Sequence, residues 1–147
     1  MYKNIVDILL IEDNDNDSEL TIRTLKKHHI ANSIYVVKDG EEAINYLYGK
    51  GSFSGIKIQL PKVILLDIKL PKINGLEVLK TIKQDEKLKG IPVVMLTSSS
   101  QDPDIKTAYA LGANSYVVKP VNIDNFTATI NNLGMYWLVV NQPPKLD

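Results

Sequence analysis

The chain has 147 residues, the size of one ordinary domain, and its 44% hydrophobic and 23% charged content is typical of a globular protein. It contains no cysteine, which excludes disulfides, thiolate metal sites and cysteine nucleophiles. The formal net charge is +0, so the basic excess usual in nucleic-acid-binding domains is missing. No apolar run approaches the ~20 residues that span a bilayer, and no signal peptide precedes the first strand pattern. We therefore expect a cytoplasmic protein without nucleic-acid or membrane partners.

Short apolar runs alternate with segments of helical periodicity along the whole chain. Continuous runs predict five buried strands, at 8–11, 34–37, 63–66, 93–96 and 116–118. One-faced apolar spacing predicts helices between them, at about 17–29, at 41–48, after Gly75 and after Pro103, with a last helix that carries Phe126, Ile130, Leu133 and Trp137. Asp17 is the expected N-cap of the first helix. Residues 49–61 predict an unusually long loop.

Alternating strands and helices indicate the fold class. Strands that are apolar throughout belong to parallel sheets covered by helices on both faces, so we predict a doubly wound α/β fold. We expect one domain over residues 1–147, with the long loop at 49–61 and an apolar tail at about 135–147. In such sheets the ligand crevice lies at the edge where the strands end.

The residues that end four of the strands form the central observation. They are Glu12 with Asp13, then Asp67, Thr97 and Lys119. Clustered carboxylates repel one another, and a divalent cation such as Mg²⁺ relieves that repulsion. An aspartate beside such an ion can accept a phosphoryl group, while an ammonium and a hydroxyl stabilise the transferred oxygens. The set therefore predicts a phosphoryl-accepting site.

At these residues the sequence resembles the receiver domain of bacterial two-component response regulators. Four segments carry the resemblance: 10–14, 66–71 followed by Gly75, 94–97 and 116–120. The resemblance covers essentially the whole chain. It implies a flavodoxin-like sheet with the strand order 2-1-3-4-5.

The resemblance also implies roles for the metal-site residues. Asp67 is the phosphoacceptor, and Asp13 and Asp67 ligate Mg²⁺ or Mn²⁺. Glu12 acts mostly through bound water, and the backbone carbonyl of Lys69 completes the protein ligands. Lys119 stabilises the transferred phosphoryl group.

Two further features follow from the same resemblance. Thr97 and Tyr116 form a switch pair, in which Thr97 moves toward the phosphoryl group and Tyr116 turns inward. The Lys119–Pro120 peptide bond is cis. The protein would be a signalling phosphoacceptor and not an enzyme.

The expected donor is a sensor histidine kinase. Within the family, the 49–61 loop, the segment 70–75 and the apolar residues 136–140 are similar to small stand-alone receivers that partner cyanobacterial phytochromes and related kinases. No output domain is visible in the sequence, so we expect signalling through contact with a downstream protein. A phosphorelay intermediate or a phosphate sink is the alternative. Surplus apolar residues in the tail suggest that the last strand, the last helix and the tail form either a homodimer or a kinase-docking surface.

Three other interpretations fit less well. The acidic run 13–17 resembles a calcium-binding loop, but Ser18 and Thr24 stand where that loop needs Gly and Glu. A phosphohydrolase with an aspartate nucleophile would want an acid where Lys69 stands. A flavin- or nucleotide-binding domain of this fold needs a Gly-rich or Ser/Thr-rich phosphate loop after the first strand, where this chain is acidic.

Overall fold

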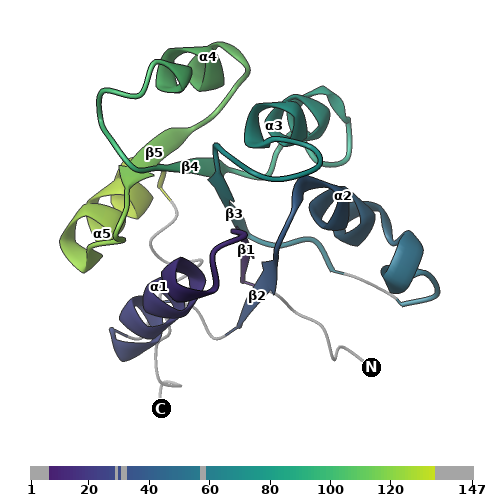
Figure 1. Cartoon of the computed structure of the whole chain (residues 1–147), viewed down its shortest axis with the longest axis horizontal. Helices are drawn as coiled ribbons and strands as arrows, with labels where there is room; N and C mark the ends of the chain where they lie inside the picture. Colours follow the sequence, from purple (N-terminus) through teal and green to yellow (C-terminus); the bar gives the residue numbers. More distant parts are fainter. Residues whose placement is uncertain (1–6, 29, 31–32, 57–58, 135–147) are drawn as a thin grey trace, which may run out of the picture.

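The computed structural model describes residues 7–28, 30, 33–56 and 59–134, in which helices and strands alternate (Figure 1). The strands are β1 (Ile8–Ile11), β2 (Ile34–Val37), β3 (Val63–Asp67), β4 (Val93–Thr97) and β5 (Ser115–Val118). The helices are α1 (Asp15–Lys27), α2 (Gly40–Tyr48), the 3₁₀ helix η1 (Gly51–Phe53), α3 (Gly75–Gln84), α4 (Asp104–Ala110) and α5 (Ile123–Asn132). The predicted alternation is therefore confirmed.

The five strands form one sheet in the order β2-β1-β3-β4-β5, and every strand pair is parallel. The predicted strand order and doubly wound fold are confirmed. In the register, Ile11 pairs with Leu66 and Asp67 pairs with Leu96. Because the strands run in one direction, the residues that follow them share one edge of the sheet.

Alternate residues of the central strands face two separate cores. In β1, Leu9 and Ile11 belong to the core that α2, α3 and α4 cover, whereas Ile8 and Leu10 belong to the core under α1 and α5. Figure 1 shows the helices divided in the same way between the two faces of the sheet. All four of these side chains are 0% exposed, which explains why the strand is apolar throughout.

Helix α1 begins earlier than the sequence pattern predicts. Its N-cap is Asn14, whose side chain accepts a hydrogen bond from the backbone N–H of Asp17 at 2.9 Å. The prediction that Asp17 caps this helix is therefore wrong. Asp17 lies in the first turn, so its own carboxylate is available for other contacts.

The described part of the long segment 49–61 contains the 3₁₀ helix η1. Phe53, at the end of η1, is buried, and its ring packs edge-on against Tyr46 with 5.1 Å between the ring centroids. The ring of Tyr35 on β2 stacks on Tyr46 at 5.0 Å. The segment is thus anchored to the sheet by an aromatic contact.

The predicted tail at 135–147, including Trp137, lies outside the described residues. Within the ranges that are described, the structure has no helix with the length and apolar character needed to cross a membrane.

Helix α3 begins in very close contact with the end of β3. A Cβ atom added to Gly75 would lie 2.1 Å from the backbone oxygen of Asp67 and 2.6 Å from that of Ile68. The backbone N–H of Gly75 also donates to the oxygen of Ile68 at 3.0 Å. Only glycine fits there without moving the strand end.

We therefore expect Gly75→Ala to lower the free energy of unfolding by about 1–3 kcal/mol or more, the usual cost of overpacking. Gly90→Ala is the matched control, because a Cβ there would meet nothing within 4 Å. That exposed change should stay within about 0.5 kcal/mol of the parent. Urea unfolding followed by circular dichroism measures both, and equal stabilities would contradict the close contact.

Candidate functional site

The predicted strand-end residues meet at one edge of the sheet. Glu12 follows β1, Asp67 ends β3, Thr97 ends β4 and Lys119 follows β5. Three of these residues are buried, because Glu12, Asp67 and Thr97 are only 1%, 6% and 2% exposed. Four residues that are far apart in the sequence therefore form one polar cluster beneath the surface.

Three carboxylates in this cluster could hold a cation. Glu12, Asp13 and Asp67 each offer an oxygen, and these oxygens all lie within 4.8 Å of one another. Asp13 is exposed whereas the other two are buried, so the group is open to solvent on one side. Oxygen ligands of this number and type fit Mg²⁺ or Mn²⁺, which retain water and accept a few carboxylates.

Lys69 lies beside the same group. Its backbone N–H donates to the Asp67 Oδ1 atom at 3.2 Å, and its side chain is exposed. This contact positions the Asp67 carboxylate, while a ligand role for the Lys69 carbonyl stays a prediction.

Lys119 is the cation at the centre of the cluster. Its Nζ atom lies 2.9 Å from Glu12 Oε1, 3.1 Å from Asp67 Oδ2 and 3.1 Å from Asp17 Oδ2. The contact with Asp17 is absent from the sequence-based set of site residues. The strand-end pattern could not reveal it, because Asp17 lies in the first turn of α1 and not at the end of a strand.

The backbone brings Lys119 to this position. Its N–H donates to the oxygen of Thr97 at 2.7 Å, which continues the pairing of β5 with β4. The Lys119–Pro120 peptide bond is cis, as the family resemblance implied.

Burial sets the charge state of the cluster. Burial, together with the neighbouring Asp67 side chain, raises the pKa of Glu12 to about 7. Burial would lower the pKa of Lys119, but its contacts with Glu12, Asp67 and Asp17 raise it above its usual value. Lys119 is therefore an ammonium at neutral pH. Glu12 is protonated in part of the molecules and ionised beside a cation in the rest.

The hydroxyl of Thr97 points toward helix α4. Its Oγ1 atom lies 3.1 Å from the backbone oxygen of Ser99 and 3.1 Å from Asp102 Oδ2. Across the described part of the chain, no hydrogen bond joins Thr97 to Asp67. Tyr116 is half-buried, and its ring packs edge-on against Tyr109 with 6.3 Å between centroids. Asp102 is a second contact that the sequence-based interpretation missed.

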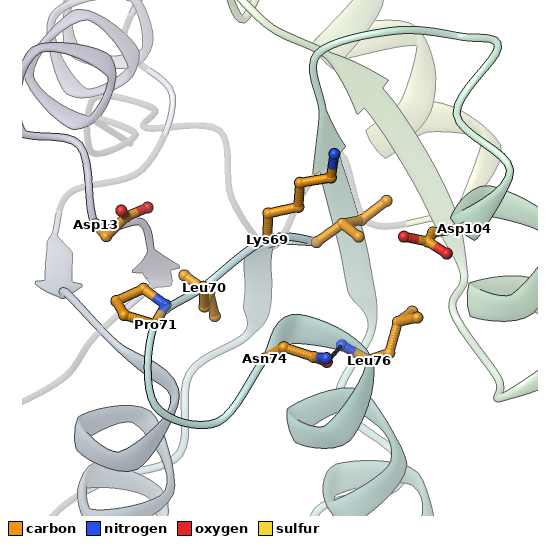
Figure 2. A pocket seen from close by; sticks show the side chains of 8 residues that line it. Asp13, Lys69, Leu70, Pro71, Asn74, Leu76 and Asp104 are labelled. Atoms are coloured by element: carbon orange, nitrogen blue, oxygen red, sulfur yellow. Dashed lines mark hydrogen bonds between the residues drawn. The ribbon is translucent and has the colours of Figure 1, made fainter.

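Cavities open at this edge of the sheet, and two of them adjoin Asp67 or Asp13. The smaller, of about 100 Å³, is lined by Asp67, Ile68, Lys69, Thr97, Ser98, Asp102 and Lys119. The larger, of about 410 Å³, adjoins it, and Figure 2 shows Asp13 and Asp104 on opposite sides of it with Lys69 between them. The smaller cavity is the space available to a group attached to the Asp67 carboxylate.

The sequence matches a known family model over most of its length. The model of the response regulator receiver domain matches residues 8–131. The chain belongs to this family. The resemblance inferred from the strand-end motifs is thus confirmed.

Curated proteins of the same family are similar over nearly the whole chain. The receiver is 37% identical over 131 residues to the response regulator Rcp1 of Synechocystis sp., which covers 89% of this chain and 88% of Rcp1. It is 39% identical over 137 residues to a probable methanogenesis regulatory protein, FilR2, of Methanothrix harundinacea, covering 93% and 86% of the two chains.

Solved structures agree with these relatives. The bacteriophytochrome response regulator AtBRR is 47% identical, with a TM-score of 0.85 over 95% of this chain and 99% of AtBRR. The Mn²⁺-bound form of Rcp1 is 36% identical, with a TM-score of 0.72 over 94% and 98% of the two chains. The narrower similarity to receivers associated with phytochromes is confirmed as well.

Removal of the central cation tests its contribution to this receiver. We expect Lys119→Met to lower the free energy of unfolding of the metal-free protein by about 3–5 kcal/mol at pH 8, because it leaves Asp67 and Glu12 buried without a counter-charge. The loss should be smaller at low pH, because Lys119 lowers the pKa of Glu12 in the parent and its removal lets Glu12 take up a proton already above pH 7. Added Mg²⁺ should restore part of it.

Lys38→Met is the matched control for that change. Lys38 Nζ lies 3.0 Å from Asp15 Oδ1, but both side chains are largely exposed, at 60% and 75%. Such surface pairs contribute about 0–1 kcal/mol. Equal losses in the two variants, measured by urea unfolding at pH 8 and pH 5.5, would contradict a central role for Lys119.

Proposed function

We propose that this receiver accepts a phosphoryl group on Asp67 from a phosphohistidine of a sensor kinase. The observation that carries the proposal is that Lys119 contacts both Glu12 and Asp67, while Asp67 and Lys119 line one small cavity. Exposed Asp13 lies beside the two carboxylates. An Asp67 oxygen attacks phosphorus, the bond between phosphorus and the histidine nitrogen breaks, and the electron pair leaves with the imidazole. The product is an acyl phosphate on Asp67, and its hydrolysis resets the protein.

A divalent cation, Mg²⁺ or Mn²⁺, would neutralise the phosphoryl oxygens when bound. Asp13 and Asp67 would hold it directly, Glu12 mostly through water, and the Lys69 carbonyl would complete the set. Support comes from the clustered oxygens and from the relative Rcp1, which has been solved in a Mn²⁺-bound form. Lys119 would move from the Asp67 carboxylate to the new phosphoryl oxygens and keep the site electrically balanced.

Phosphorylation would then shift a conformational equilibrium. The Thr97 hydroxyl would turn from Ser99 and Asp102 to a phosphoryl oxygen, and Tyr116 would turn further inward. A nearly complete reversal of the two populations requires about 5.5 kcal/mol of differential stabilisation. The protein would act as a signalling phosphoacceptor, not as an enzyme that turns over a separate substrate.

The partner we propose is a sensor kinase of the phytochrome type. AtBRR, which is similar over nearly the whole chain, is described as a bacteriophytochrome response regulator. The receiver would act in the cytoplasm, on a downstream protein, and could dimerise through β5, α5 and the tail beyond residue 134. A relay or phosphate-sink role uses the same chemistry. A phosphohydrolase role is disfavoured, because Lys69 occupies the position of its second acid.

Phosphoryl labelling is the direct test. Incubation with phosphoramidate and Mg²⁺ should add about 80 Da, the mass of one phosphoryl group, to the intact protein. The gain should need the metal and disappear in Asp67→Asn. Asp124→Asn, which changes an exposed acid on α5, should label like the parent. Lys119→Ala should still accept the group but fail to switch. Undiminished labelling of Asp67→Asn would rule out the assignment.

Metal binding should depend on pH through Glu12. Because burial raises the pKa of Glu12 to about 7, binding at lower pH must first displace a proton. The apparent Mg²⁺ affinity should be at its maximum above about pH 7.5 and fall by up to about tenfold per unit below pH 7.

Calorimetric titration in two buffers of different ionisation enthalpy would count the protons released. Proton release near pH 6.5 is the expected result. In Glu12→Gln the affinity should be weaker and nearly independent of pH between 6 and 8. An affinity of the parent protein that stays constant over that range would exclude a role for Glu12 protonation.

A further inference from the structure

Asp102 joins the hydroxyl of Thr97 to the beginning of helix α4. Its Oδ2 atom accepts from Thr97 Oγ1 at 3.1 Å, and its Oδ1 atom accepts from the backbone N–H of Asp104 at 2.9 Å. Asp104 is the first residue of α4. One half-buried carboxylate therefore bridges the end of β4 and the first turn of the helix.

We propose that Asp102 is a positioning residue that holds Thr97 in the unphosphorylated arrangement and transmits the movement of Thr97 to α4. The inference rests on the proposed function, because it assumes that Thr97 turns to a phosphoryl group on Asp67. The hydrogen bond between Thr97 and Asp102 would stabilise the unphosphorylated state, and phosphorylation would have to break it.

The bond competes directly with phosphoryl binding. A threonine hydroxyl has one proton to donate, so Thr97 cannot donate to Asp102 and to a phosphoryl oxygen together. The backbone oxygen of Ser99 is also 3.1 Å away, but a carboxylate is the stronger acceptor because it is charged. Thr97 is 2% exposed, so water is a poor substitute for either partner.

Charge adds to this competition. The Asp102 carboxylate lines the same cavity of about 100 Å³ as Asp67, Thr97 and Lys119. A phosphoryl group on Asp67 would bring a second anion into that space and repel Asp102 while it attracts the Thr97 hydroxyl. Both effects separate Thr97 from Asp102.

Helix α4 is able to respond to that separation. It has seven residues, of which Ala108 alone is buried, and Tyr109 is 46% exposed. A helix that buries so little apolar surface is held weakly by packing. Release of Asp102 would therefore free the first turn of α4 at little cost.

Titration with beryllofluoride in the presence of Mg²⁺ measures the effect, because this ion imitates an aspartyl phosphate without being hydrolysed. The hydrogen bond from Thr97 to the charged Asp102 exists only in the resting state. Its loss in Asp102→Ala should therefore raise the apparent affinity for beryllofluoride about tenfold over the parent. In a Thr97→Val background, which keeps the side-chain shape but lacks the hydroxyl, the same change should alter affinity less than about twofold.

Two further variants separate the hydrogen bond from charge. Asp104→Asn removes a negative charge two residues away that has no contact with Thr97, and it should leave the affinity within about twofold of the parent. Asp102→Asn keeps an oxygen acceptor without the charge, so its affinity should lie between those of the parent and Asp102→Ala. Fluorescence or calorimetric titrations of the four single variants and the double variant supply the comparison.

The outcomes distinguish failure of the phosphoacceptor function from failure of the positioning role of Asp102. A parent protein that binds no beryllofluoride would overturn the proposed function and this inference together. A parent that binds it, with unchanged affinity in Asp102→Ala, would overturn the inference alone. An equal gain for Asp102→Ala with and without the Thr97 hydroxyl would also overturn it, because Asp102 would then act by charge or helix stability and not through Thr97.

Discussion

The imbalance of charge around Lys119 is the constraint on which the site depends. One ammonium contacts Glu12, Asp17 and Asp67, and Asp13 adds a further carboxylate beside them. In water such an excess would be screened, but Glu12 and Asp67 are buried, so the excess must be met by a proton or a second cation. The raised pKa of Glu12 is the sign of that demand in the metal-free protein. Such a charge excess favours a divalent cation, and the proposed function depends on this property.

The sheet makes this imbalance possible by holding the strand ends rigidly. Parallel pairing in register brings Asp67 beside Leu96, and both cores fix β3 from its two faces. Gly75 adds a close backbone contact directly behind Asp67. The Asp67 carboxylate is therefore attached to a closely packed strand, so charge repulsion cannot be relieved cheaply by moving that strand.

Most of the fold and the centre of the site could be predicted from the sequence. Continuous apolar runs specify buried parallel strands, and parallel strands deliver their following residues to one edge, so Glu12, Asp67 and Lys119 were predictable as neighbours. The N-cap of α1 was not, because residues 13–17 offer several side chains that can cap a helix. The tertiary contact of Asp17 with Lys119 occupies its carboxylate, and Asn14 caps instead. No periodic signal could reveal such a choice.

Asp102 illustrates a different limit of sequence reasoning. Its partners, Thr97 and the N–H of Asp104, are specified by the path of a loop, and loop paths leave no periodic pattern in the sequence. Yet this contact explains how the proposed switch could have a small difference in free energy between its two states. A buried hydroxyl that lost its partner would cost about 1–3 kcal/mol, whereas one that exchanges a carboxylate for a phosphoryl oxygen keeps a charged acceptor in both states. In the proposed switch the two states can then lie within a few kcal/mol of each other, and one phosphoryl group on Asp67 would be enough to shift helix α4.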